Sequence, residues 1–537
     1  MAAEAGGDPP PAPTDMRRAA KKLWKSESGS VAPIVAISLF ALIGAAGIGF
    51  DYSRLAAMHT ELQDAADHAA LAAAAQLDGK TGAQTRAKAA AKTLITNLAL
   101  FANDGANRSV SVSDSNVLFY QDKAKTTLST SDANSYFVQV TVDTKQAVYA
   151  LTPVVAAFTS GSINAKAFAG VASGICKVPP VMICNPQETL TNKTFDATGL
   201  IGDGLNLVSV GDGNGGWSPG NFGYLNTSGG SNGAQGLREG LGWLTPAGDC
   251  QPTTGVNTKP GASVSVTDAL NTRFDIYEPG QSCPAGGTCP PSANTVKDLV
   301  WTSSNGNGNG NTPTNACTLG NSGWHESDKP YVPTSATTPL TNGQMPDAMG
   351  YPRDMCHAIS SNGSCTNGRI GNGTWDRNAY FYVNYGSSFD WQSAMTTAGY
   401  NPATVTRYQV YKWELTSPSS RINTPRSVTG GFTSNGAPIC WAGSPAGGIV
   451  PGGANVDRRR ISAAIVNCQQ YGVNGASTNV PVVKWVELFL VEPSLNRASG
   501  FTSSGDIYAE IIGETNTGSA GGTAGQVVRK DVPYLIE

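Results

Sequence analysis

The sequence predicts an α+β protein: a single N-terminal transmembrane helix continues into a long amphipathic helix with a small antiparallel sheet, and a large β-rich domain follows. Three observations support this class. An uncharged apolar run of about 20 residues, Val31–Phe50, precedes an alanine-rich stretch with helical periodicity. All 10 cysteines lie beyond residue 175. That remainder is rich in Gly, Asn, Ser and Thr and contains short alternating segments typical of strands.

The length of 537 residues suffices for several domains with a substantial core. Only 14% of the residues are charged and the net charge is −3, so no overall positive field exists to recruit nucleic acid. We therefore expect no nucleic-acid partner. Low charge together with 63 glycines is typical of an extracytoplasmic, loop-rich protein.

Residues 1–28 are expected to form a disordered basic tail, and residues 29–50 the transmembrane helix. Five basic residues precede the apolar run: Arg17, Arg18, Lys21, Lys22 and Lys25. Positive charge is retained on the cytoplasmic side of a membrane helix, so the chain beyond Asp51 is expected outside the inner membrane. A cleaved signal peptide is the alternative, with Gly44-Ala45-Ala46 as its cleavage region. The apolar run continues to Phe50, which favours a retained anchor.

Small residues occur at helical spacing within the span. Small side chains allow close approach of another membrane helix, although glycine is also simply common in such helices. The candidates for helix packing are Gly44, Ala45, Gly47 and Gly49.

Residues 51–175 are expected to form an α+β lobe. The first helix should continue to about Leu77, and a second should run over Ala83–Phe101. Strands are predicted at Ser109–Tyr120, Tyr136–Val142 and Ile163–Val171. The first helix carries one apolar stripe: Leu55, Met58, Leu62, Ala65, Ala69 and Ala72. This stripe either packs in the lobe's own core or binds a partner helix.

Residues 176–537 are expected to form the β-rich, disulfide-containing region. Its cysteines are Cys176, Cys184, Cys250, Cys283, Cys289, Cys317, Cys356, Cys365, Cys440 and Cys468. Their even number favours disulfides in an oxidising compartment, since the chain has no CxxC pair and only 4 histidines for zinc. Short separations make Cys176–Cys184, Cys283–Cys289 and Cys356–Cys365 the first pairs to expect.

Short strands are predicted throughout this region, and Asn305–Asn311 reads as a low-complexity loop. The strand candidates are Leu205–Val210, Ala262–Val266, Ala379–Tyr385, Ile461–Val466, Val482–Val491 and Ile507–Ile512. An aromatic-rich zone comprises Trp375, Tyr380, Tyr382, Tyr385, Tyr408, Tyr411 and Trp413. We expect it to pack in a core, with a carbohydrate or protein contact surface as the alternative.

No set of residues predicts catalysis, and we expect a non-enzymatic protein without cofactor or metal. The G-x-S-x-G pattern around Ser231 lacks the preceding apolar strand that a nucleophile needs. His325 and His357 have no ligand partners at metal-binding spacing, and Asp203 and Asp212 lack the further carboxylates of a calcium loop. The basic run Arg458–Arg460 is expected to be a solvated strand start.

The N-terminal segment resembles the Tad (tight adherence, or Flp) pilus-assembly proteins of the TadE/TadG-like group. The resemblance is carried by Gly29–Ala32, the apolar span, Phe50–Arg54 (FDYSR), Leu62–Asp67 (LQDAAD) and Ala69–Ala75. Weaker similarity to the C-terminal region of some TadG-related proteins occurs at 176–186 and 483–493. The resemblance implies a pilin-like lobe in an inner-membrane component of pilus assembly. This component would act as a scaffold or minor pilin, supporting adherence and contacting other Tad proteins through the alanine-rich helix.

The sequence departs from the family pattern at two points. Pilins of this system carry a glutamate soon after the processing glycine, whereas Ser30–Ile34 contains none after Gly29, so we expect no prepilin cleavage. Many TadG proteins also carry an Asp-x-Ser-x-Ser metal motif, which is absent here. A surface adhesin that binds glycan or protein is the alternative function, and an envelope hydrolase is a second one.

Overall fold

The computed structural model describes residues 31–93, 99, 109–155, 160–176, 178–209, 217–226, 233–246, 251–252, 255–259, 264–278, 281–302, 317–320, 323–359, 365–416, 425–441, 448–452, 455–497, 500, 502–515 and 528–536. The chain divides into two compact units. The first, called the lobe, comprises Met1–Ala172 and Asp531–Glu537, and the second, called the body, comprises Ser173–Lys530. The sequence-based division ended the lobe at residue 175 and did not anticipate the return of the C-terminal residues to it.

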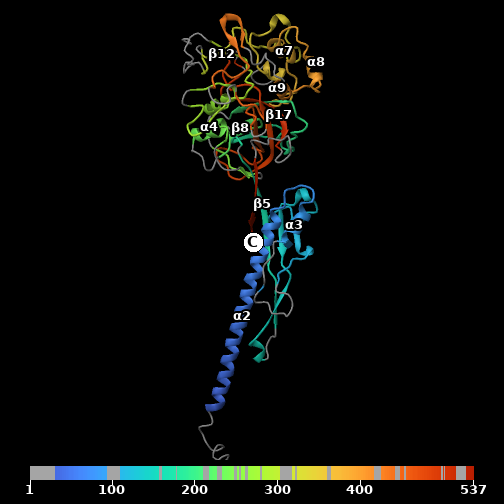
Figure 1. Ribbon diagram of the computed structural model, residues 1–537, viewed down its shortest axis with the longest axis vertical. Coiled ribbons are helices and arrows are strands. Elements are labelled where there is room, and N and C mark those ends of the chain that lie inside the picture. Colours follow the sequence, from blue (N-terminus) through green and yellow to red (C-terminus); the bar gives the residue numbers. More distant parts are fainter. Residues whose placement is uncertain are drawn as a thin grey trace, which may run out of the picture. The chain divides into compact units, whose positions relative to one another are not determined.

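Helix α2 (Val31–Ala74) is continuous through the apolar run and the alanine-rich stretch, as expected, and is the long blue helix in Figure 1. It contains no internal proline beyond its first turn, where proline is tolerated. Side chains of the apolar run are mostly exposed, with Ile37 70% accessible. From Met58 onward, one face of α2 is buried in the lobe. One helix therefore combines a candidate membrane span with a packed core element.

The lobe places α2 against a second helix and an antiparallel sheet. Helix α3 (Ala83–Thr93) begins where the Asp132 carboxylate accepts hydrogen bonds from the Gly82 and Gln84 amides. Strands follow the order β1-β2-β5-β18, with β9 (Gln251–Pro252) pairing with the end of β5. Their bounds are β1 Val117–Tyr120, β2 Phe137–Thr141, β5 Lys166–Cys176 and β18 Val528–Leu535. Valines from β1 and β2 pack on the alanines of α2 and α3.

Several bounds in the lobe differ from those predicted. The second helix is described over Ala83–Thr93, and residues 94–98 and 100–101 of the predicted range lie outside the described part of the chain. Only the end of 109–120 is a strand, because Asp114–Asn116 forms a 3-10 turn. The strand predicted at Ile163–Val171 is confirmed from Lys166 onward as β5, but its start is wrong, because Ile163 is the last residue of β4 (Ser160–Ile163). Strand β4 pairs instead with β3 (Lys145–Val148) in a separate hairpin.

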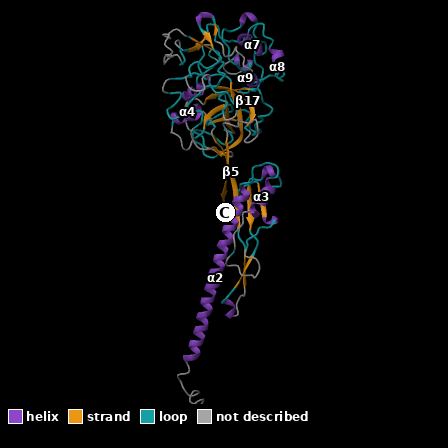
Figure 2. Ribbon diagram, viewed as in Figure 1, coloured by secondary structure: helices purple, strands orange, loops and turns teal. Residues whose placement is uncertain are grey.

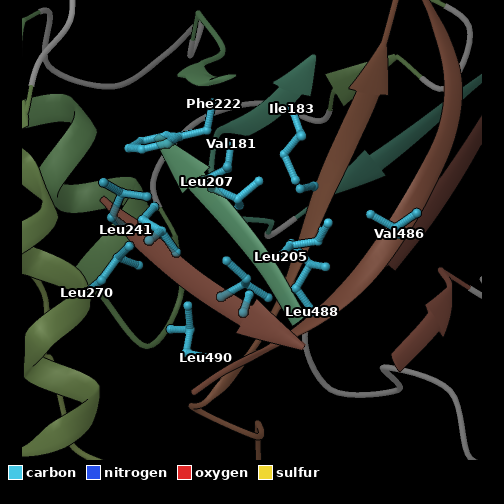
Figure 3. Packing of buried hydrophobic residues seen from close by; sticks show 14 of the residues in the cluster. Val181, Ile183, Leu205, Leu207, Phe222, Leu241, Leu270, Val486, Leu488 and Leu490 are labelled. Atoms are coloured by element: carbon cyan, nitrogen blue, oxygen red, sulfur yellow. The ribbon is translucent and has the colours of Figure 1, made fainter. Parts of the chain in front are cut away.

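The body is built on a mixed sheet that closes on itself. The order is β10-β16-β15-β6-β8-β7-β17, and β17 pairs back onto β16. Closure removes the free edges that an open sheet would expose. The strands are β6 Val181–Cys184, β7 Gly204–Ser209, β8 Asn221–Tyr224, β10 Gly255–Val256, β15 Arg460–Val466, β16 Val480–Leu490 and β17 Ile507–Glu514. Figure 3 shows Ile183, Leu205, Val486 and Leu488 projecting from these strands into one shared core.

Helices and a smaller sheet surround the closed sheet. Figure 2 shows short strands in orange separated by long teal loops, as the glycine-rich composition predicts. The helices are α4 Ala234–Gly242, α5 Asp268–Asn271, α6 Met355–Ala358, α7 Arg377–Tyr385, α8 Trp391–Thr397 and α9 Arg407–Thr416. The four-stranded sheet is β12-β11-β14-β13, with bounds Trp324–Glu326, Leu299–Trp301, Thr433–Ser434 and Arg426–Ser427. Together with the lobe, this makes a mixed α+β protein with an N-terminal apolar helix and a β-rich body.

Two predicted strands are wrong. Ala379–Tyr385 lies in helix α7, because the Asp376 carboxylate caps its N-terminus by accepting from the Ala379 amide at 2.9 Å. Gly386, at φ 93°, ends the helix. The aromatic side chains suggested a strand, but they are buried around the helix rather than on alternate faces. In the second case, Val264–Thr267 forms a 3-10 turn instead of the strand expected at 262–266.

Four disulfides join described cysteines. Cys283–Cys289 and Cys356–Cys365 pair as the short separations suggest, whereas Cys317–Cys440 spans 123 residues. The expected Cys176–Cys184 pair is wrong, because Cys184 pairs with Cys468. Cys184 ends β6 and Cys468 follows the end of β15. The parallel pairing of these two strands brings the cysteines together although they are 284 residues apart in sequence. Cys176 is itself disulfide-bonded, and no described cysteine is free.

The basic run is not a solvated strand start. Arg458 and Arg459 are buried, and their guanidinium groups donate to backbone carbonyls of neighbouring segments. Arg458 donates to Pro290 and Gly242, while Arg459 donates to Leu490. The planar guanidinium satisfies several buried carbonyls at once, so this run stabilises loop packing inside the body.

Candidate functional site at the end of the apolar span

Asp51, at the C-terminal end of the apolar span, makes a buried polar contact with the lobe. Its carboxylate is 2% exposed and accepts three backbone hydrogen bonds, from the amides of Ala150, Leu151 and Thr152 at 2.9, 3.0 and 2.7 Å. Thr152 begins the 3-10 turn η4 (Thr152–Val155), and amides at the start of a helical turn have no carbonyl partner within that turn. They are therefore suited to bind the negative charge of Asp51. Asp51 thus fixes the turn between β3 and β4 to the helix.

Glycines in α2 make room for the same turn. A Cβ atom on Gly47 would lie 2.9 Å from Leu151 Cβ, closer than carbon atoms pack. Closer to the C-terminus of α2, Leu55 approaches β4: a Cβ atom on Gly161 would lie 3.3 Å from Leu55 Cδ1. The β3–β4 hairpin therefore runs along α2 from the level of Leu55 down to Gly47, inside the apolar run.

The four small residues predicted to pack membrane helices separate into two pairs. Gly44 and Gly47 are buried, and Gly47 contacts the chain's own hairpin. Ala45 and Gly49 are exposed, and nothing lies within 4 Å of where a Gly49 Cβ would be. Within the described residues, the small-xxx-small pair Ala45/Gly49 thus stays open to another helix.

The alanine-rich face of α2 is buried in the lobe's own core. Ala65, Ala66, Ala69 and Ala70 have no exposed surface and lie in the cluster formed with α3 and β2. Of the two readings of this stripe, the structure supports the intramolecular one. The lobe itself covers this stripe, so a contact of the alanine-rich helix with other pilus proteins would have to use other faces of α2.

Among its described residues, the body gathers one group with metal-ligand chemistry, Cys356, His357 and Cys365, whose ligand atoms lie within 4.8 Å of one another. The two sulfurs are joined as a disulfide, so neither is a thiolate. Both ring nitrogens of His357 are engaged, with the Tyr508 hydroxyl at 2.9 Å and the Gly368 carbonyl at 2.8 Å. Burial lowers the pKa of His357, so the ring is neutral and structural.

A buried ion cluster lies beside this group and was missed by sequence reasoning. Arg407 binds Asp354 and Glu510, and the side chains of all three are essentially inaccessible. Burial opposes charge on Arg407, but the two carboxylates outweigh it and raise the pKa of this guanidinium. No local sequence pattern predicts this cluster, because Asp354, Arg407 and Glu510 are far apart in sequence and come together only in the folded protein. Burial and the charge of Asp354 also raise the pKa of Asp203, one of the two calcium candidates, to about 6.

The aromatic zone is a core and not a contact surface. Trp375, Tyr380 and Tyr411 are at most 2% exposed. The hydroxyls of Tyr351, Tyr380 and Tyr385 all donate to the Glu414 carboxylate, which is buried. Burial raises the pKa of Glu414, and these donors oppose that rise. Ser231 and Asp212 lie outside the described residues.

Residues 29–76 match the family model described as Tad, putative Flp pilus-assembly TadE/G-like. No curated protein and no solved structure matches the chain. The matched segment contains the span, the small residues, Asp51 and the alanine face of α2. Residues 29–76 are therefore similar to the TadE/G-like proteins of putative Flp pilus assembly, in agreement with the resemblance seen in the sequence.

Proposed function

We propose that the protein is a non-enzymatic, membrane-anchored component of Flp pilus assembly, acting as a scaffold or minor-pilin-like subunit that supports adherence. The observation that carries this proposal is the match over residues 29–76, because it coincides with the one helix that joins the span to the lobe. The buried aromatic zone gives no support to the alternative of an adhesin surface there.

We place the anchor in the inner membrane with its N-terminus in the cytoplasm. The five basic residues between Arg17 and Lys25 favour this orientation. Disulfides in the body agree with an oxidising compartment on the other side of the membrane. Two independent properties thus support the same topology.

Another membrane helix of the assembly machinery is the partner we propose for the exposed face at Ala45 and Gly49. Leucine at both positions is expected to weaken this packing by about 1–3 kcal/mol, because added bulk separates the helices. Pili counted by electron microscopy, and photocrosslinks formed from a probe at Ile48, should both fall several-fold.

The matched control is Ala46→Leu, which adds similar bulk at an exposed neighbouring position of the same helix. Pilus number should stay near the wild-type value in this strain. A gene deletion sets the lower limit and should abolish or strongly reduce piliation. Normal pili in the deletion strain would reject the proposed function as a whole, whereas normal pili only in the Ala45/Gly49 double variant would reject this partner surface.

A further inference from the structure

The described end of the β3–β4 hairpin, residues 148–153 and here called its tip, is uncharged and carries exposed apolar side chains. Residues 146–165 contain no Asp, Glu, Lys or Arg, although Lys145 and Lys166 flank them. Val148 is 43% exposed and Leu151 is 39% exposed, while the polar Thr152 is buried. Two apolar side chains thus face outward at the described end of the hairpin, while the backbone amides of residues 150–152 point to Asp51 in α2.

The position of this tip along α2 sets its depth. Leu151 packs on Gly47, which lies three residues before Phe50, the last residue of the apolar run. At a rise of 1.5 Å per residue, Gly47 is about 4.5 Å inside the end of that run. Ile48 and Phe50, one and three residues beyond Gly47, are 54% and 50% exposed. The medium that surrounds these helix side chains must also surround Leu151.

We propose that residues 148–153 enter the outer leaflet of the bilayer beside α2, with lipid acyl chains and the headgroup boundary as their partner. The inference rests on the membrane anchor proposed above. Asp51 makes insertion feasible, because its carboxylate satisfies three backbone amides that would otherwise be unpaired next to lipid. The protein then contacts the membrane through the helix and the hairpin together, which fixes the lobe's rotation about α2.

A fluorescent amino acid placed at single positions in the full-length protein tests this inference. The protein is reconstituted in phosphatidylcholine–phosphatidylglycerol vesicles with and without lipids carrying a quencher near the headgroup. The probe at 151 should be strongly quenched and blue-shifted, as should a probe at Ile48 in the span.

Leu118 provides the matched control, because it is also 39% exposed and lies in the same lobe. Its position along α2 follows from three contacts. Leu118 pairs with Gln139 in β2, and Thr141 at the end of β2 pairs with Lys166. The side-chain amide of Gln63 in α2 donates to the Lys166 carbonyl. Gln63 is 16 residues beyond Gly47, about 24 Å along the helix, so a probe at 118 should remain unquenched.

The outcomes separate the two proposals. Quenching at 48 and 151 but not at 118 supports the inserted hairpin. Quenching at 48 alone overturns it while leaving the anchor intact, and would assign the apolar tip to a protein partner instead. Absence of quenching at 48 contradicts the membrane anchor itself.

Discussion

Serine at both Cys184 and Cys468 is expected to lower the free energy of unfolding of the body by about 5 kcal/mol. The bond closes a loop of 284 residues, and the chain entropy that a crosslink removes from the unfolded state grows with loop length. Both sulfurs are also buried between β6 and β15, where their loss weakens packing. Urea unfolding of the purified protein in nanodiscs, followed by circular dichroism, measures the change.

The control is the pair Cys283 and Cys289, which closes only 6 residues. The same entropy relation gives a loss of about 2 kcal/mol for their replacement by serine. A similar loss for both double variants would show that loop closure does not determine the stability of the body.

Arg407→Met is expected to destabilise the body by about 3–5 kcal/mol, because it leaves the carboxylates of Asp354 and Glu510 buried without their cation. The loss should shrink as pH falls. In the folded variant, the buried carboxyl groups of Asp354 and Glu510 have pKa values above those in the unfolded chain. The folded variant therefore binds protons more readily than the unfolded one, and its stability rises as pH falls. Urea unfolding at pH 5 and pH 7.5 measures both effects.

Arg238→Met is the matched control, since its ion pair with Asp268 is 15–16% exposed and should be worth about 1 kcal/mol or less. Adding Asp354→Asn and Glu510→Gln to Arg407→Met should restore part of the stability by removing the unpaired charges. If Arg407→Met costs no more than the control, the buried cluster is not a major stabilising element.

Features encoded in contiguous residues could be predicted. Residues close to one another in sequence determine the apolar run, the helical stripe after it and the short-range disulfides. The match of 29–76 to a family model depends on the same local pattern. The strands β15, β16 and β17 were also predicted near their observed positions, because buried β-branched runs mark them directly.

Features that arise from long-range pairing could not be predicted. The Cys184–Cys468 bond follows from the parallel pairing of β6 and β15, which no local signal specifies. Arg459 was expected in solvent by its charge, yet it is buried because carbonyls from distant segments surround it. The role of Asp51 was missed for the same reason, since its three donors lie about 100 residues away.

Protease treatment of intact spheroplasts most directly tests the central claim, a retained anchor at residues 31–50 with the lobe and body outside. The account predicts loss of the chain beyond about Asp51 and a small membrane-bound N-terminal fragment that only lysis exposes to protease. Replacing the five basic residues from Arg17 to Lys25 with neutral ones should weaken this pattern. Release of wild-type protein by osmotic shock, with an N-terminus near Gly47, would contradict it and identify the span as a signal peptide.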